Sequence, residues 1–302
     1  MKLRRCKAIN PLQFRNVLDS SSTYIEPLIV KNVCSDWIAT KNWLNIDGLK
    51  KRIDNQKIQV NVETIGHYMN PNMELIQMGF SDLLDYYSKQ TNNTQKPLKH
   101  VYLAQQDLSN IGDLMNDITI PPFINNNKDN LYGIKLWLCG PHGSTSPCHY
   151  DSTHNILCQV FGEKHVILFP PVEGKLLYPA FGTSQKNTSR IDFDLLEPSF
   201  FQSLPQHTDI TDSSDHTNSS SQSPVISTTR NLSNIETATF NDNNEIILDD
   251  NHPLLTRYPS LKHSTNAIIA TIHPGDGLFI PLKHWHYCTA KSSSCSVNFW
   301  WL

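Results

Sequence analysis

From Leu131 to the end of the chain, short segments with the composition of β-strands follow one another. Turn residues separate them, among them Gly162, Pro170-Pro171 and Pro274-Gly275. The strand-like segments are 132–138, 155–160, 165–169, 267–272, 277–280 and 295–301. Many short strands in one stretch of chain bury their apolar side chains by forming a sandwich or a closed barrel. The sequence therefore predicts a mainly β fold.

The first 130 residues mix helical and extended patterns. Apolar residues recur at helical spacing in Leu12–Leu18, Trp43–Ile53 and Phe80–Tyr87, whereas Pro27–Lys31 and Lys57–Glu63 read as strands. We therefore expect residues 1–130 to form an α/β cover and residues 131–302 to form the β core.

Between about residues 203 and 251 the composition changes abruptly, and Asp212–Ser223 is almost purely polar. Such a segment buries too little apolar surface to offset the entropy lost when it becomes ordered. Strand-like segments lie on both sides of it. The sequence therefore predicts a disordered insertion within the β core.

Composition argues against a nucleic-acid-binding, a membrane-spanning and a secreted protein. The 302 residues carry a formal net charge of −3 and no long Lys/Arg run, which argues against a nucleic-acid partner. No apolar run has the length of a membrane span, and none follows Met1 as a secretory signal would. Seven cysteines without a CxxC pair indicate reduced thiols. We expect an intracellular protein of the nucleus, the cytoplasm or both.

Three side chains carry the pattern of a metal site. His149 and Asp151 are two residues apart, so on an extended chain they point to the same face. A second histidine, His286, lies far downstream. Two imidazoles and one carboxylate form the facial triad of non-haem Fe(II) oxygenases, which leaves three coordination positions open. An isolated His-x-Asp pattern also arises by chance, and its histidine is then a surface or hydrogen-bonded residue.

Lys164 begins the second strand after this motif. It shares one strand face with Val166 and Leu168. A lysine on an apolar face must be paired, or its pKa shifts. The far carboxylate of 2-oxoglutarate would be a suitable partner. The alternative is a lysine at a strand start whose ammonium reaches solvent.

Several longer segments resemble one known family. They are Tyr102–Leu108, Asp117–Pro122, Trp137–Pro147, Asn187–Asp192, Gly275–Pro281 and Ser296–Trp301. Together they resemble the Jumonji C (JmjC) domain oxygenases, in particular the branch of lysine demethylase 8, which is also described as an arginyl hydroxylase. The resemblance implies a double-stranded β-helix, a cupin-like jelly roll, beneath the N-terminal α/β cover.

The resemblance also implies roles for individual residues. Fe(II) would be held by His149, Asp151 and His286, while His284, which precedes Trp285, would not be a ligand. The cosubstrate 2-oxoglutarate would be bound by Lys164, Tyr102, Ser146 and Asn155, beside a wall formed by Trp137. Glu63 and Gln105 match positions that contact a cationic substrate side chain. A carboxylate and an amide suit a guanidinium, which needs planar acceptors. Glu63 could instead be a solvated strand residue.

The implied activity is an Fe(II)- and 2-oxoglutarate-dependent hydroxylation, with O₂ as the second cosubstrate and a protein or peptide as substrate. The arginine side chain is the first expected target. A histone methyl-lysine demethylase and a tRNA-modifying hydroxylase are alternatives with the same iron site, and a cupin-like binding module without turnover is a non-enzymatic one. Because the last predicted strand ends at Trp301, with no helical extension after it, we expect a monomer.

Overall fold

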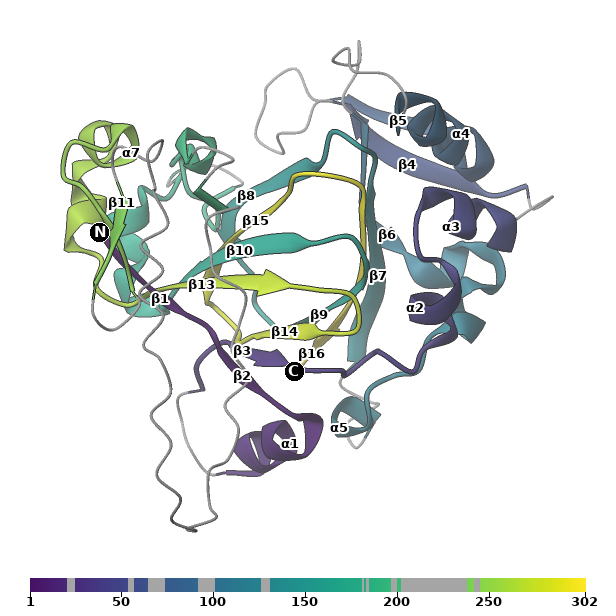
Figure 1. Cartoon of the computed structure of the whole chain (residues 1–302), viewed down its shortest axis with the longest axis horizontal. Helices are drawn as coiled ribbons and strands as arrows, with labels where there is room; N and C mark the ends of the chain where they lie inside the picture. Colours follow the sequence, from purple (N-terminus) through teal and green to yellow (C-terminus); the bar gives the residue numbers. More distant parts are fainter. Residues whose placement is uncertain are drawn as a thin grey trace, which may run out of the picture.

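Two β-sheets face each other and close into a jelly roll, which confirms the predicted mainly β fold (Figure 1). The structure is a computed structural model. It describes residues 1–20, 25–53, 57–64, 74–91, 101–125, 131–180, 182, 185–196, 200–201, 238–241 and 245–302.

Within the described residues, one sheet has seven strands and the other nine. The seven-stranded sheet has the order β11 (Ala238–Phe240), β12 (Ile246–Leu248), β1 (Lys2–Arg5), β13 (Ala267–Ile272), β10 (Lys164–Phe169), β15 (Trp285–Ala290) and β8 (Ser144–Tyr150). The nine-stranded sheet has the order β2 (Lys7–Ile9), β3 (Leu28–Val30), β14 (Gly277–Ile280), β9 (His154–Phe161), β16 (Ser294–Trp301), β7 (Leu131–Cys139), β6 (Val101–Asp107), β4 (Gln59–Thr64) and β5 (Glu74–Gly79).

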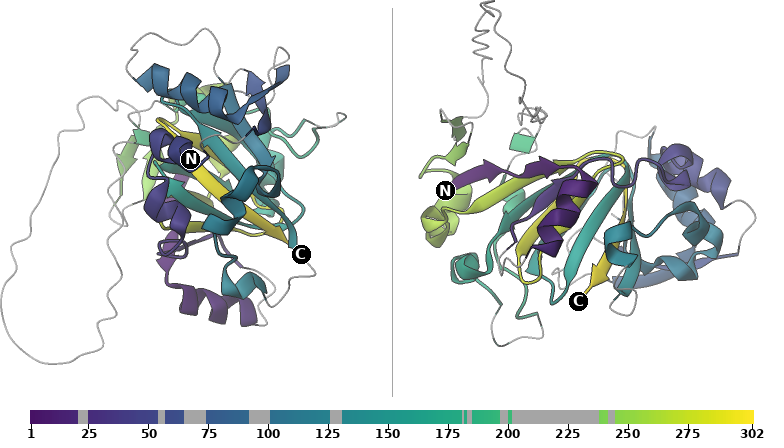
Figure 2. Two further views of the ribbon diagram at one scale, coloured as in Figure 1. Left: turned by 90° about the vertical axis from the view of Figure 1, so that its right-hand side faces the viewer. Right: turned by 90° about the horizontal axis from the view of Figure 1, so that it is seen from below.

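Helices from the first half of the chain cover the nine-stranded sheet (Figure 2). The α-helices are α1 (Pro11–Asp19), α2 (Ile38–Asn42), α3 (Ile46–Arg52), α4 (Phe80–Thr91), α5 (Pro122–Asn125) and α7 (Pro253–Arg257). Short 3₁₀ turns are η1 (Leu108–Asn110), η2 (Gly112–Asp117), η4 (Pro171–Leu177), η5 (Phe193–Leu195) and η6 (Pro259–His263). None of the helices in the described ranges is both long and apolar enough to cross a membrane.

The helix α1 shows how the sequence forms this cover. Asn10 caps its N-terminus by accepting a hydrogen bond from the Gln13 backbone, and the Gln13 side chain accepts one from the Asn10 backbone in return. Pro11 occupies the first turn, where no donor is needed. Phe14 is fully buried and packs edge-on against Phe123 and at a tilt against Phe279.

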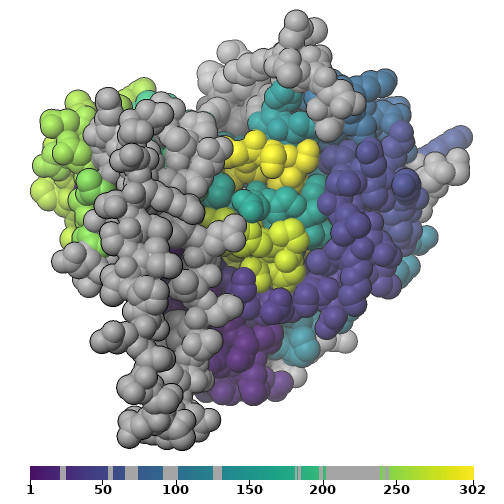
Figure 3. Space-filling model, in the orientation of Figure 1, coloured from purple at the N-terminus to yellow at the C-terminus, as the bar shows by residue number. Residues whose placement is uncertain are grey.

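Alternation along the strands separates the barrel interior from the covered faces. On β16, Val297, Phe299 and Trp301 join the core beneath the N-terminal helices. Asn298 and Trp300, on the opposite strand face, line a cavity between the two sheets. In the space-filling view, teal and yellow residues of the later strands surface between the purple and blue N-terminal elements and the green ones (Figure 3). A cavity therefore lies between the two sheets of the jelly roll.

The N-terminal segment is more than a cover, which corrects the predicted division at residue 130. Strand β1 pairs in parallel with β13, and β3 pairs antiparallel with β14, so both are part of the barrel sheets. Three- and four-residue strands are too short to show an alternating pattern, and Lys2, Arg4 and Arg5 make β1 look polar.

The predicted disordered insertion is wrong for its last part. Residues 238–240 and 246–248 form the hairpin β11–β12, and β12 pairs with β1. Ile246 and Leu248 are buried against the outer face of the seven-stranded sheet. Ile246 and Leu248 alternate on one strand face. The strand is hard to recognise in the sequence because acidic and amide residues flank it on both sides. Residues 203–237 lie outside the described part of the chain.

The Ile246→Ala substitution tests this correction. Ile246 pairs with Leu3 and is almost fully buried, so its truncation is expected to cost about 2–4 kcal/mol of unfolding free energy. Ile247→Ala is the matched control, because Ile247 is only half-buried. Urea unfolding measures both variants. Equal midpoints for wild type and Ile246→Ala would mean that β12 contributes nothing to the folded core.

Candidate metal centre

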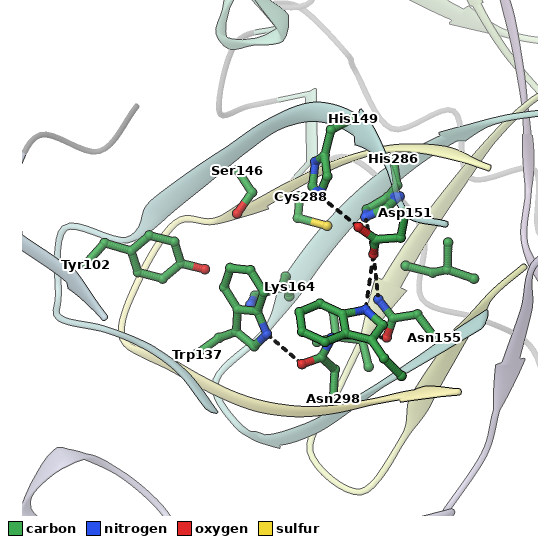
Figure 4. A pocket seen from close by; sticks show the side chains of 13 residues that line it. Tyr102, Trp137, Ser146, His149, Asp151, Asn155, Lys164, His286, Cys288 and Asn298 are labelled. Atoms are coloured by element: carbon green, nitrogen blue, oxygen red, sulfur yellow. Dashed lines mark hydrogen bonds and ion pairs between the residues drawn. The ribbon is translucent and has the colours of Figure 1, made fainter. Parts of the chain in front are cut away.

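The side chains of His149, Asp151 and His286 converge at one end of the cavity (Figure 4). Their ligand atoms all lie within 4.8 Å of one another, and no other group of His, Cys, Asp or Glu in the described ranges comes as close. The Asp151 carboxylate lies between the imidazoles, with Oδ1 3.9 Å from His149 Nε2 and Oδ2 3.8 Å from His286 Nε2. The two imidazole ring centroids are 4.3 Å apart.

A β-bulge in β8 allows both Ser146 and His149 to face the cavity between the sheets. Across the β8–β15 ladder His149 pairs with His286 and Ser146 with Cys288, so two residues of β8 stand opposite one of β15. The extra residue reverses the alternation, and Ser146 and His149 both face the cavity. Pro147, which lacks a backbone donor, lies within the bulge, where proline is tolerated.

Backbone carbonyls determine the tautomer of both histidines. His149 Nδ1 lies 2.7 Å from the Pro147 oxygen, and His286 Nδ1 lies 3.0 Å from the His284 oxygen. A carbonyl only accepts, so each Nδ1 carries the proton and each Nε2 presents a lone pair toward Asp151. Burial lowers the pKa of His286 to about 4, which keeps its imidazole in the neutral form that binds metals.

Hydrogen bonds also hold the Asp151 carboxylate in place. The Trp300 indole donates to Asp151 Oδ2 at 3.1 Å, and the Asn155 amide reaches the same oxygen at 3.5 Å. Asn298 donates to Asn155 Oδ1 and accepts from the Trp137 indole, so one hydrogen-bonded chain links the cavity wall to Asp151. Oriented imidazoles plus an oriented carboxylate fit a divalent metal such as Fe(II).

The cavity beside this centre encloses about 350 Å³, part of it open to solvent. We call it the inner cavity. It is lined by Tyr102, Trp137, Ser146, His149, Asp151, Asn155, Leu157, Lys164, Ile280, His286, Cys288, Asn298 and Trp300. Every residue predicted to bind the metal or 2-oxoglutarate is among them.

Lys164 is the cation of the inner cavity. It is 4% exposed, and its Nζ lies 5.9 Å from the centre of the Trp137 ring. Burial lowers the pKa of Lys164, and no carboxylate pairs with it among the residues that the structure describes. A buried ammonium that lacks an anionic partner is costly to the fold, so a cavity of this kind suits an anionic ligand.

Tyr102 and Ser146 add polar groups beside Lys164. Tyr102 is buried, and it lines the inner cavity together with Ser146. Burial raises the pKa of Tyr102, so the phenol stays protonated and can donate to an anion. A carboxylate in the inner cavity would therefore meet one ammonium and two hydroxyl groups.

A second cavity adjoins the first, and the two share Tyr102, Trp137, Ser146, His149 and Asp151. This vestibule encloses about 510 Å³ and is lined by Glu63, Tyr102, Ala104, Gln105, Trp137, Thr145, Ser146, Pro147, His149, Asp151, Asn187 and Thr188. It contains both residues predicted to contact the substrate. Glu63 pairs with Tyr102 across the β4–β6 ladder, and burial raises its pKa to about 7.

Gln105 reaches the vestibule through an unusual backbone. Its φ is +53°, in the left-handed region that few non-glycine residues adopt, within an irregularity of β6 between Leu103 and Gln106. Ala104 and Gln105, although neighbours in sequence, both line the vestibule as a result. Strain of this kind persists where the surrounding structure enforces it.

His284 is not among the three converging side chains. It is buried, its pKa is lowered to about 4 by burial, and it lines neither cavity. Its contribution to the centre is its backbone carbonyl, which orients His286.

The sequence predictions missed Cys288, Asn298 and Trp300, which line the inner cavity. The polar and apolar alternation of Ser296–Trp301 was the available signal for the last two, since it puts Ser296, Asn298 and Trp300 on one strand face.

The chain is similar to several known proteins. The family described as the cupin-like domain matches residues 14–302. Jumonji C domain-containing protein 5 of Drosophila melanogaster is 27% identical over 281 residues, which are 91% of this chain and 54% of that protein. Lysine-specific demethylase JMJ30 of Arabidopsis thaliana is 26% identical over 276 residues, 91% of this chain and 49% of that protein.

A human relative is named a bifunctional peptidase and (3S)-lysyl hydroxylase, JMJD7. It is 21% identical over 301 residues, 91% of this chain and 77% of that protein. The chain spans about half the length of the fly and plant relatives. It belongs to the cupin-like domain family, and the fly relative among these proteins is named for a Jumonji C domain.

Proposed function

We propose that this protein is an Fe(II)- and 2-oxoglutarate-dependent oxygenase that hydroxylates a cationic side chain of a protein substrate, arginine first among them. The observation that carries the proposal is the presence, in one cavity, of a two-histidine, one-carboxylate centre and a buried Lys164 with which no carboxylate of the described residues pairs. Bound Fe(II) would supply the activation of O₂, which is coupled to the oxidative decarboxylation of 2-oxoglutarate.

The chain's own groups bind and orient the reactants. His149, Asp151 and His286 would hold Fe(II) through Nε2 and carboxylate oxygen atoms. Lys164 would bind the far carboxylate of 2-oxoglutarate, with Tyr102 and Ser146 donating hydrogen bonds to it. Asn155 and Trp137, in the hydrogen-bonded chain to Asp151, would wall the cosubstrate and keep the carboxylate ligand in place.

The substrate would enter through the vestibule. Glu63 and Gln105 line it on one side of the centre, and a guanidinium there would meet a carboxylate and an amide oxygen. The chemistry also fits a methyl-lysine ammonium, and one relative bears the name of a lysine-specific demethylase. Demethylation therefore remains the second candidate, with the same centre and cosubstrate.

A peptide panel tests the proposal. Purified protein with Fe(II), 2-oxoglutarate and O₂ is given arginine, lysine and methyl-lysine peptides, and the products are read by mass spectrometry. The proposal expects 2-oxoglutarate turnover coupled to the gain of one oxygen on an arginine peptide. Loss of a methyl group would favour the demethylase, and oxygen added only to lysine peptides would exclude arginine as the target. Absence of 2-oxoglutarate turnover with every peptide would contradict the proposal.

The pH dependence of peptide binding is a second test. Because the pKa of Glu63 is raised to about 7, the group is mostly neutral at pH 6 and mostly ionised at pH 8. A cationic substrate prefers the ionised form, so the KM of the peptide is expected to fall roughly tenfold from pH 6 to pH 8.

Glu63→Gln is the matched control, since it keeps the shape and cannot ionise. Its peptide KM should be high and nearly independent of pH, while its KM for 2-oxoglutarate stays within about twofold of wild type. A wild-type peptide KM that is the same at pH 6 and pH 8 would remove Glu63 from substrate recognition.

A further inference from the structure

The outer edge of β8 is paired by a short extended segment around Asn187–Ser189. Ser189 N–H donates to the Cys148 carbonyl at 2.7 Å, and Thr188 forms an isolated antiparallel bridge with His149. Thr188 and Ser189 are almost fully buried. The strand that carries His149 and ends directly before Asp151 is thus paired on both sides, by β15 and by this segment.

Asn187 holds the residue between the two ligands. Tyr150 N–H donates to the Asn187 backbone carbonyl at 3.0 Å, and the Asn187 side-chain amide donates to the Tyr150 carbonyl at 3.0 Å. Both backbone polar groups of Tyr150 are therefore bonded to one residue. Since His149 and Asp151 flank Tyr150 directly, these two bonds control the backbone that joins the ligands.

The segment is itself anchored from behind. Ala180 N–H donates to the Thr188 carbonyl at 2.9 Å, and Arg190 N–H donates to the Tyr178 carbonyl at 3.0 Å. The Ser189 hydroxyl donates to the Leu177 carbonyl. Thr188 and Ser189 consequently lie between β8 and residues 177–180, and Asn187 lies in the turn that directly precedes them.

We propose that Asn187 is a positioning residue for the metal centre. Its amide keeps the backbone of Tyr150 in the conformation that directs His149 Nε2 and the Asp151 carboxylate to one point. Asn187 is not one of the three predicted metal ligands. It would affect metal binding only through the backbone of Tyr150, which joins two of them. The inference rests on the proposed function only in requiring that the centre bind a divalent metal.

The test is a titration of Mn²⁺ into the full chain, without 2-oxoglutarate or peptide, followed by calorimetry. Asn187→Ala is expected to weaken Mn²⁺ binding about tenfold, the lower end of what the loss of an outer partner costs a metal site. Asn187→Asp keeps the shape, loses the donor and turns a carboxylate oxygen toward the Tyr150 carbonyl, so it should weaken binding at least as much. It also carries the test if the alanine variant does not fold.

Asn266→Ala is the matched control. It removes an amide hydrogen bond of 3.0 Å to Glu173 in a neighbouring part of the fold, with no contact to β8. It should lower the melting temperature to a similar extent and leave Mn²⁺ affinity within about twofold of wild type. At saturating metal, the Asn187 variants should keep their KM for 2-oxoglutarate within about twofold, because the inner cavity is unchanged.

The outcomes separate the two proposals. Wild-type protein that binds no Mn²⁺ overturns the metal centre and with it the proposed function. Wild-type binding that is unchanged in both Asn187 variants overturns the positioning role alone. Weakening of equal size in Asn266→Ala would also overturn it, because the effect would then come from general loss of stability.

Discussion

His286→Ala is expected to abolish 2-oxoglutarate turnover, whereas His284→Ala retains most of it. The two residues are of the same type, two positions apart, and both buried, so they form a matched pair. His286 contributes an Nε2 lone pair 3.8 Å from Asp151, while His284 contributes only its backbone carbonyl, which alanine preserves. Removing one of three ligands leaves too few donors to hold the ion in place.

His149→Ala and Asp151→Ala should behave as His286→Ala does. Turnover is measured as succinate released from 2-oxoglutarate, and Mn²⁺ affinity is measured on the same samples. Circular dichroism establishes that each variant is folded. Full activity in His286→Ala together with its loss in His284→Ala would reverse the assignment of the third ligand.

The predictable part of this site is the part that local spacing encodes. The two-residue interval of His149 and Asp151 and the position of Lys164 at a strand start are visible in the sequence. The position of His286 relative to them depends on the pairing of β15 with β8, which joins residues far apart in the chain. The resemblance to a known family supplied that third position, since spacing alone leaves His284 and His286 as alternatives.

The groups that orient the ligands could not be predicted. Two of them are backbone carbonyls, those of Pro147 and His284, and a backbone group has no sequence signature. Trp300 reaches Asp151 from the last strand, and its orientation follows from the register of β16 against β9. Strand register depends on the whole sheet, and a shift of one residue would turn Trp300 to the opposite face.

The fold was predicted where strands are long or strongly apolar. The ranges 267–272 and 277–280 coincide with β13 and β14. Strands β1, β2 and β12 were missed because each has only three or four residues and lies near a sheet edge, where charged side chains are tolerated. Their apolar residues become informative only once the neighbouring strand is known.

Lys164→Met is expected to weaken 2-oxoglutarate binding by roughly 30-fold or more, because truncating one partner of a buried charge pair costs about 2–5 kcal/mol. Methionine keeps the length of the side chain and removes its charge, so the inner cavity keeps its shape. Mn²⁺ affinity should stay within about twofold of wild type, since Lys164 is no ligand. Lys283→Met is the control, because Lys283 is exposed and lies over the Tyr150 ring outside the inner cavity.

The same substitution is expected to stabilise the ligand-free protein. Burial lowers the pKa of Lys164 below its unfolded value, so at pH values between the two the unfolded chain binds more protons at this site than the folded chain does. The lowered pKa means that the buried ammonium destabilises the folded state. This penalty is largest at low pH, where Lys164 is charged in both states, and it diminishes as pH rises. Lys164→Met removes this penalty, so the melting temperature without 2-oxoglutarate should increase, and the gain should shrink as pH rises from the folded-state pKa of Lys164 toward the unfolded-state value.

Together the two effects distinguish a binding residue from a structural one. A lysine kept for stability would give a lower melting temperature when replaced, with little change in 2-oxoglutarate affinity. A lysine that serves binding would give a higher melting temperature and a much weaker 2-oxoglutarate affinity when replaced. The reason is that its buried charge destabilises the fold until the cosubstrate neutralises it. Isothermal titration of 2-oxoglutarate and thermal unfolding with and without it measure both. Unchanged 2-oxoglutarate affinity in Lys164→Met would remove Lys164 from the cosubstrate site.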